Sequence, residues 1–350
     1  MSRKKLAKPA VPLKVLMLMD REFVPPDDVS AMTPEQIRPF KMELDVSVAL
    51  RKLGHEVRML GLHDDLGVLR SAIDEFKPHL AFNLLEGFAD FHGFDQHVVA
   101  YLELIRQRYT GCNPRGMTLA RDKALTKKIM HYHRIPVPAF AVFPRDRRMV
   151  RPKGLPFPLL VKSVNVEASI GIARASIVHD DEKLAERVKY IHEALGTYAI
   201  AEQYIPGREL YVGVIGNLRL RTFPVWELLF EKAPEDMPII ATNKAKFDAA
   251  YQDRWGITTR AAQDLDPKLQ KQIPRLCKRI YRHLGLTGYA RLDFRLTPEG
   301  QLFLLEANPN PQIAANEDFA DSAEAAGVKY EPLIQQVLNL GLSYRPELLS

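Results

Sequence analysis

Two acidic side chains and an amide stand close together in the stretch of residues 290–312. Apolar and charged residues alternate there before a Thr-Pro-Glu-Gly sequence, which predicts a β-hairpin with Gly300 at a positive-φ position of the turn. A connection of two or four residues would set Asp293 opposite Glu306, whereas a three-residue loop would shift this pairing by one. Because side chains two residues apart on a strand share a face, Asn308 is expected beside Glu306.

Facing carboxylates of this kind repel each other unless a cation lies between them. Carboxylate and amide oxygens suit Mg²⁺, a hard cation that also holds the phosphates of nucleotides. We therefore predict that Asp293, Glu306 and Asn308 bind magnesium, with two ions expected and Mn²⁺ as the alternative metal. The other interpretation is a solvated strand face with scattered charges.

A second group of residues fits the phosphates of a nucleotide. Lys162 ends an apolar segment that begins at Phe157, so its stem would be buried while its ammonium group reaches an anion. The loop that follows, residues 165–172, contains Ser169 and Gly171, whose small side chains leave backbone N–H groups accessible to phosphate. No GxxxxGK motif followed by Ser or Thr occurs, so this loop is not a P-loop.

The elements that would position these residues begin with an alternation of strands and helices. Strands are predicted at residues 13–19, 57–62 and 80–84, and helices at 38–53, 66–76 and 95–108. This alternation indicates a Rossmann-like α/β domain with a parallel sheet. Beyond it we predict a helix at 119–136, strands at 198–201, 210–215 and 218–226, a long loop at 237–251, and helices at 266–284 and 330–340.

Composition limits the class of protein. The 350 residues suit two or three domains, and the absence of an apolar run of about 18 residues argues against a membrane span. Cys112 and Cys277 form no metal-binding or disulfide motif, which is typical of the reducing cytoplasm. The net charge of +6 comes from dispersed basic residues, so nucleic acid is not an expected partner, and a homodimer stays open. Residues 1–12 are expected to form a disordered basic tail.

Taken in order, these motifs resemble those of the ATP-grasp superfamily, and within it those of the D-alanine–D-alanine ligase-like enzymes. Arg291 and Asp293 match the family's R-x-D strand, and Glu306 and Asn308 match its E-x-N strand. The resemblance covers roughly residues 13–340. It implies an α/β (α+β ATP-grasp) fold in which a Rossmann-like parallel-sheet domain at 13–118 precedes a small lid at 119–205 and a C-terminal domain with the metal and catalytic site at 206–350.

The resemblance also implies roles for individual residues. Lysines at phosphate-binding positions of the family are Lys123, Lys162 and Lys246, of which Lys246 is also expected to act in catalysis. In a linker that contacts the nucleotide, Glu202 and Ile205 would read the adenine edge and Glu209 would take the ribose hydroxyls. Arg291 would stabilise the oxyanion of the reaction. Glu43, in a sequence similar to the family's E-x-x-V-S, would hold the amino group of the first substrate, and a helix-surface glutamate is the alternative.

The substrate-binding part of the match is incomplete. Ala168 and Phe247 replace hydroxyl residues that flank the first substrate in the family, and Glu317 replaces a serine near the second. The alternative for Glu317 is a side chain that turns to solvent or pairs with a neighbouring lysine. The implied activity is that of an ATP-dependent carboxylate–amine ligase that forms a peptide bond via an acyl phosphate. D-alanine–D-alanine ligation is the reference activity, and the replacements leave other amino-acid or peptide substrates open. A kinase-like ATP-grasp phosphotransferase and a non-catalytic nucleotide-binding protein are the alternatives. For Lys127 and Lys128, further along the helix of Lys123, a solvated helix face is the competing interpretation.

Overall fold

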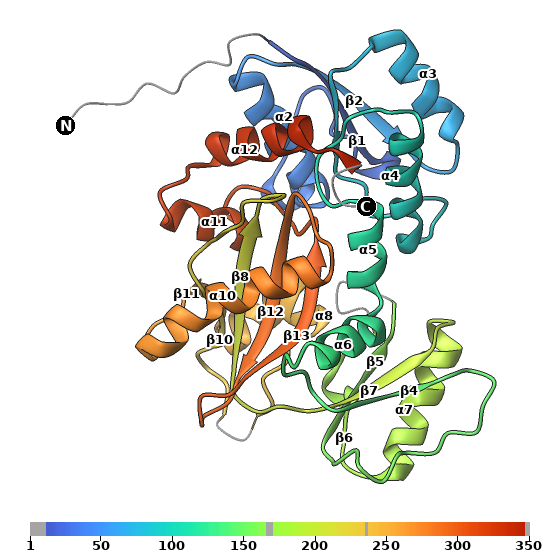
Figure 1. The fold of residues 1–350 in the computed structure, drawn as a ribbon, viewed down its shortest axis with the longest axis vertical. Helices are drawn as coiled ribbons and strands as arrows, with labels where there is room; N and C mark the ends of the chain where they lie inside the picture. Colours follow the sequence, from blue (N-terminus) through green and yellow to red (C-terminus); the bar gives the residue numbers. More distant parts are fainter. Residues whose placement is uncertain (1–11, 166–170, 235–236, 347–350) are drawn as a thin grey trace.

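The computed structural model describes residues 12–165, 171–234 and 237–346, and Figure 1 shows how their elements are arranged. These described residues form three β-sheets, with strand orders β2-β1-β3, β4-β7-β5-β6 and β11-β10-β8-β12-β13, and β9 pairs with β8. The first sheet lies at one end of the long axis of the molecule, the second at the other end, and the third between them (Figure 1). None of the helices in these residue ranges is long and apolar enough to cross a membrane.

The first sheet confirms the predicted parallel arrangement. Its strands are β1 (Lys14–Asp20), β2 (Glu56–Leu62) and β3 (Leu80–Asn83), and β1 pairs in parallel with both neighbours. The helices of this part are α1 (Pro34–Ile37), α2 (Lys41–Lys52), α3 (Leu66–Phe76) and α4 (Asp95–Leu104). The helix predicted at 38–53 begins later because Pro39 lies in a 3-10 turn, and the one predicted at 95–108 ends earlier because Arg106 adopts a φ of 55°.

The C-terminal helix returns to the first sheet. After α11 (Asp318–Ala325), α12 (Tyr330–Ser343) packs Leu333 and Ile334 into one buried cluster with residues of α2 and of the sheet. Gly341 was predicted to end this helix, but the helix continues through it. The glycine instead allows close packing, since a Cβ at this position would meet the carbonyl oxygen of Tyr109 at 2.4 Å.

The helix predicted at 119–136 is two helices, α5 (Pro114–Arg121) and α6 (Lys123–Tyr132). Asp122 between them has an extended backbone, with φ −77° and ψ 99°, and its carboxylate accepts the N–H of Leu125 at 2.8 Å. An aspartate is a preferred N-cap residue, so it ends one helix and begins the next. The break places Lys123 in the first turn of α6, close to the third sheet (Figure 1).

The second sheet carries Lys162. Its strands are the antiparallel β4 (Phe140–Phe143), β5 (Leu159–Ser163), β6 (Ile177–Val178) and β7 (Ala199–Gln203), and α7 (Asp181–Ala194) covers one face. Leu159 and Val161 pack into the cluster beneath α7. Because side chains alternate along a strand, Lys162 points to the opposite face. Ser169 and Ala168 lie outside the described residues.

The third sheet carries the predicted metal residues. Its strands are β8 (Arg208–Ile215), β9 (Arg221–Thr222), β10 (Trp226–Phe230), β11 (Ile257–Ala261), β12 (Tyr289–Leu296) and β13 (Leu302–Pro309). The strand predicted at 218–226 is interrupted between β9 and β10, where Pro224 cannot donate to a ladder. The segment at 237–251 was predicted as a loop, but capping by Thr242 and Asp248 starts α8 (Asn243–Phe247) and α9 (Ala249–Trp255).

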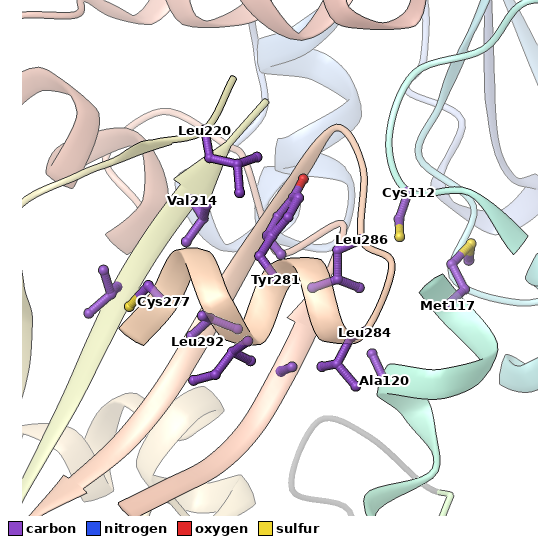
Figure 2. Close-up of a cluster of buried hydrophobic side chains, with 14 of the residues drawn as sticks. Cys112, Met117, Ala120, Val214, Leu220, Cys277, Tyr281, Leu284, Leu286 and Leu292 are labelled. Atoms are coloured by element: carbon purple, nitrogen blue, oxygen red, sulfur yellow. The ribbon is translucent and has the colours of Figure 1, made fainter. Parts of the chain in front are cut away.

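A large apolar core joins this sheet to the helices on one of its faces. Figure 2 shows Cys277 and Tyr281 of α10 (Pro267–His283) beside Val214, Leu220 and Leu292. Met117 and Ala120 of α5 belong to the same cluster (Figure 2). The opposite face of the sheet is therefore the one that can carry charged side chains toward the second sheet.

The hairpin of β12 and β13 confirms the pairing of Asp293 with Glu306, but for a reason that the sequence did not show. The turn shifts the pairing near its end by one residue, so that Leu296 pairs with Leu302. A β-bulge after Asp293 then inserts Leu305 as an extra residue and restores the predicted register. The two deviations cancel.

Candidate active site

Arg291, Asp293 and Asn308 converge on one face of the hairpin. Arg291 donates from Nε and Nη2 to the two carboxylate oxygens of Asp293 at 2.8 and 2.9 Å, and Asn308 donates to Asp293 Oδ2 at 2.9 Å. The guanidinium group also lies over the ring of Tyr211, 4.6 Å from its centroid. These contacts hold Arg291 in one orientation.

Glu306 lies within reach of cations from several elements. Lys162 of β5 donates to its Oε1 at 2.9 Å. Burial alone would raise the pKa of the Glu306 carboxyl, but the ammonium groups of Lys162, Lys123 and Lys246 outweigh burial and hold this pKa well below its ordinary value. Glu306 is therefore an anion at neutral pH.

The donor set fits the predicted magnesium. Asp293, Glu306 and Asn308 offer carboxylate and amide oxygens on adjacent strands, the ligand types that Mg²⁺ prefers. No group of three or more His, Cys, Asp or Glu side chains in the described part of the chain could hold a metal, so the set depends on its two acids, the amide and whatever the substrate supplies. A Mg²⁺ ion held there would neutralise negative charge on phosphate oxygens.

A cleft of about 620 Å³, open to solvent, lies between the second and third sheets next to these residues. The sequence-predicted site residues that line it are Lys162, Glu202, Ile205, Glu209, Lys246, Asp293 and Glu306. The structure therefore brings together residues that are up to 144 positions apart in the chain.

Glu202, at the end of β7, is 2% exposed and lies between two lysines. Its Oε1 is 3.1 Å from the Nζ atom of Lys127 and 3.2 Å from that of Lys162. The interpretation of Lys127 as part of a solvated helix face is wrong, because its side chain is 1% exposed, whereas Lys128 is exposed. The signal in the sequence was the spacing from Lys123, since residues four apart share a helix face.

Glu209, on β8, is also paired inside the protein. Arg295 donates to its Oε2 at 2.8 Å, and the hydroxyl of Tyr211 donates to its Oε1 at 3.0 Å. Arg295 further donates to the carbonyl oxygens of Gly207 and Ile239. The sequence analysis did not single out Arg295, although its spacing of two from Asp293 places both on one face of β12.

The remaining predicted phosphate residues surround the same centre. Lys123 is buried at the start of α6 and Lys246 lies on α8, and both are near enough to Glu306 to lower the pKa of its carboxyl. Gly171 has a φ of 75°, a conformation that side chains rarely adopt, and the next residue, Ile172, lines the cleft. The phosphate roles of these residues, like that of Ser169, stay predictions.

Glu43 is buried on α2, with 2% exposure, so the alternative of a helix-surface glutamate is wrong. It shares a helix face with the buried Ser47 and Leu50, a spacing that was visible in the sequence. Burial raises the pKa of its carboxyl to about 8, and the nearby carboxylates of Glu86 and Asp20 contribute to the increase. A cationic group brought to this position would favour the ionised form.

We expect Glu43→Gln to stabilise the protein relative to wild type by an amount that grows from about pH 5 to about pH 8. The carboxyl ionises near 4.5 in the unfolded chain but near 8 in the folded protein, so between these values the unfolded state holds fewer protons. Wild-type stability must then fall with pH, by at most about 1.4 kcal/mol per pH unit from this group. Urea denaturation at several pH values measures it, with the exposed Glu182→Gln as control. A pH-independent difference would contradict the burial of an acidic Glu43.

The specificity residues are described only in part. Glu317 precedes α11 at the N-cap position, where its exposed side chain makes no capping hydrogen bond. Phe247 is the last residue of α8, but its side chain, like Ala168, lies outside what the structure describes. The proposed effects of these replacements therefore stay predictions.

Comparison with known proteins adds independent observations. Residues 129–339 match the protein family described as D-ala D-ala ligase C-terminus. A D-alanine–D-alanine ligase of Pelotomaculum thermopropionicum is 31% identical over 281 residues, which cover 77% of this chain and 82% of the relative. An uncharacterized protein of Sinorhizobium fredii is 31% identical over 303 residues, which cover 84% of this chain and 85% of the relative.

Among solved structures, a D-alanine–D-alanine ligase from Bacillus anthracis complexed with ATP superposes with a TM-score of 0.73 at 20% identity. The match covers 94% of this chain and 97% of that one. The shared fold therefore extends over all three sheets.

Proposed function

The chain belongs to the D-alanine–D-alanine ligase family of ATP-grasp enzymes, and from this premise we propose how its own residues carry out the reaction. It is an ATP-dependent ligase that forms a C–N bond between a carboxylate and an amine. The observation that carries the residue assignment is the meeting of Lys162, Lys246, Asp293 and Glu306 in one cleft, which Glu202 and Glu209 also line. Cations and metal-binding oxygens suit a triphosphate, and the two further acids suit an adenosine.

The reaction would proceed in two steps. The γ-phosphoryl group of ATP passes to the carboxylate of the first substrate and forms an acyl phosphate with release of ADP. The amine of the second substrate then attacks this acyl carbon, and inorganic phosphate leaves with the original carboxylate oxygen. Lys123, Lys162 and Lys246 would balance phosphate charge, and Arg291, held by Asp293, would stabilise the oxyanion of the tetrahedral intermediate.

The first substrate would place its ammonium group at Glu43, where an ion pair would favour the ionised carboxylate. We propose substrates other than two D-alanines, because Ala168 and Phe247 cannot supply hydroxyl groups and Glu317 disfavours a nearby carboxylate. The two unpaired cysteines fit a reducing cytoplasm.

The experiment that tests this function measures ADP release from MgATP over pairs of D- and L-amino acids, with mass spectrometry of the products. We expect an amide product in equal amount to ADP for at least one pair. A phosphorylated product that persists without amide would instead support a phosphotransferase, and the absence of ADP with every pair would support a nucleotide-binding protein without catalysis.

Glu209→Gln should weaken ATP binding by roughly 1 to 3 kcal/mol, because a charged acceptor for the ribose hydroxyls is replaced by a neutral amide. Calorimetry with the 2′,3′-dideoxy form of ATP is the matched control, since this nucleotide lacks both hydroxyls. The variant and the wild type should bind it alike. An equal loss of affinity for both nucleotides would show that Glu209 acts only within the fold, through Arg295 and Tyr211.

Glu317→Ser should raise kcat/KM for acceptors that carry an unmasked carboxylate, such as D-alanine, by about tenfold, because it removes a repelling charge. Asp321→Ser, an acidic residue one turn further along α11, provides the control. Unchanged activity of Glu317→Ser would indicate that the exposed Glu317 side chain points to solvent during turnover.

A further inference from the structure

Lys127 makes contacts that the assignments above do not use. Its side chain extends from α6 and is 1% exposed, so a full ammonium group is buried. The Nζ atom donates to the carbonyl oxygen of Leu305 at 2.8 Å and lies 3.1 Å from Glu202 Oε1. Burying a charged lysine costs free energy unless its partners compensate, so we expect these contacts to have a structural or functional role.

The two lysines lie within ion-pair distance of the same oxygen of Glu202. Lys127 lies 3.1 Å and Lys162 lies 3.2 Å from Oε1, and all three side chains are buried. Two ammonium groups beside one buried oxygen favour the orientation of the carboxylate in which Oε1 faces them. The contacts found in the described part of the chain occupy Oε1, so Oε2 is the oxygen that Glu202 can present to a ligand in the cleft that it lines.

The second partner of Lys127 is the extra residue of the β-bulge. Leu305 restores the register that sets Glu306 opposite Asp293, and its carbonyl oxygen accepts a hydrogen bond from Lys127 Nζ. Lys162 meanwhile spans from Glu202 to Glu306, at 3.2 and 2.9 Å. Lys127 therefore provides Glu202 with a second positive neighbour, so that the ammonium group of Lys162 can also pair with Glu306.

We propose that Lys127 is a positioning residue that holds Glu202 so that Oε2 accepts the 6-amino group of an adenine base, and that it thereby sets the preference of the cleft for 6-aminopurine nucleotides. The inference rests on the proposed function, which places the base of ATP at Glu202. An oriented carboxylate oxygen accepts a hydrogen bond from an N–H donor, and a purine without the 6-amino group cannot donate this bond. A 6-oxo group in the same place would be repelled, because its oxygen and the carboxylate oxygen both carry negative charge.

The test compares dissociation constants of MgATP and of magnesium purine riboside triphosphate, which lacks the 6-amino group, by calorimetry. Lys127→Met keeps most of the length of the side chain and removes its charge, and Lys128→Met is the matched control on the exposed side of the same helix. We expect the preference for ATP over the analogue to fall about tenfold in Lys127→Met, as for loss of a charge-assisted hydrogen bond, and to stay unchanged in Lys128→Met.

Glu202→Gln and the double variant complete a cycle. If Lys127 acts through Glu202, the double variant should show the same preference as Glu202→Gln alone. A preference that Glu202→Gln abolishes but Lys127→Met leaves intact would overturn the role of Lys127 and leave the proposed function standing. A preference unchanged in Glu202→Gln would overturn the adenine assignment itself.

Partial unfolding does not mimic the expected result, because it lowers the binding stoichiometry for both nucleotides and leaves the ratio of their dissociation constants unchanged. Should Lys127→Met not yield folded protein, Lys127→Gln, which retains an N–H donor for the Leu305 carbonyl, is measured in the same way with the same expected fall in preference.

Discussion

Glu306→Gln should lower the rate of ADP formation by about 10³-fold or more while the fold remains intact. The substitution removes one of the two acids that would hold magnesium, and loss of a single preorganised electrostatic group at a reacting centre already costs about 10²–10³-fold. The glutamine amide fills nearly the same volume and can still contact Lys162, so the hairpin has no reason to change register. Steady-state ADP release measures the effect, and circular dichroism checks the fold.

Glu299→Gln is the matched control for this variant, because the residue lies exposed in the turn of the same hairpin. It should retain wild-type turnover. Near-normal ADP formation by Glu306→Gln would contradict the assignment of Glu306 as a required magnesium ligand.

Lys162→Met should have the second large effect, on both stability and nucleotide binding. The substitution leaves Glu306 without its 2.9 Å partner and Glu202 with Lys127 alone. Removal of one member of a buried ion pair typically costs about 3–5 kcal/mol, and we expect a loss of that order in the free energy of unfolding. ATP affinity should fall as well, because Lys162 is one of the cations that we propose to face the phosphates.

The pH dependence separates this loss from a packing defect. In wild type the pKa of Glu306 is lowered, so its contribution to stability is present above the ordinary glutamate range and is lost as pH falls below it. The gap between wild type and Lys162→Met should therefore narrow below about pH 4.5. Lys183→Met, on the exposed face of α7, controls for loss of a surface lysine. A gap of constant size at all pH values would contradict the ion-pair account.

Much of the fold could be predicted from the residues because the signals were local. Continuous apolar runs gave β1 and β3, and the helix at 66–76 matches α3 (Leu66–Phe76) at both ends. Helix caps were harder to predict. Asp122 divides a segment that apolar periodicity alone predicts as one continuous helix. Thr242 and Asp248 likewise began helices inside a segment that had been predicted as a loop.

The network of buried charges could not be predicted fully, because its partners come from distant parts of the chain. Lys127 meets Glu202 and the carbonyl of Leu305, and no local pattern links α6 to both. The register of Glu306 depended on two compensating irregularities, neither of which alternation reveals. By contrast, helical spacing from Ser47 and Leu50 indicates that Glu43 is buried, although a helix-surface position had been kept as the alternative.

The central claim is that the chain transfers phosphate from ATP to a substrate carboxylate before an amine attacks, and an isotope experiment tests it most directly. Amino acids labelled with ¹⁸O in their carboxyl groups are incubated in pairs with MgATP and the purified protein, and the released phosphate is examined by mass spectrometry. We predict that every amide bond formed delivers one ¹⁸O atom to inorganic phosphate, together with one ADP. Unlabelled phosphate, or AMP and pyrophosphate in place of ADP, would contradict the account.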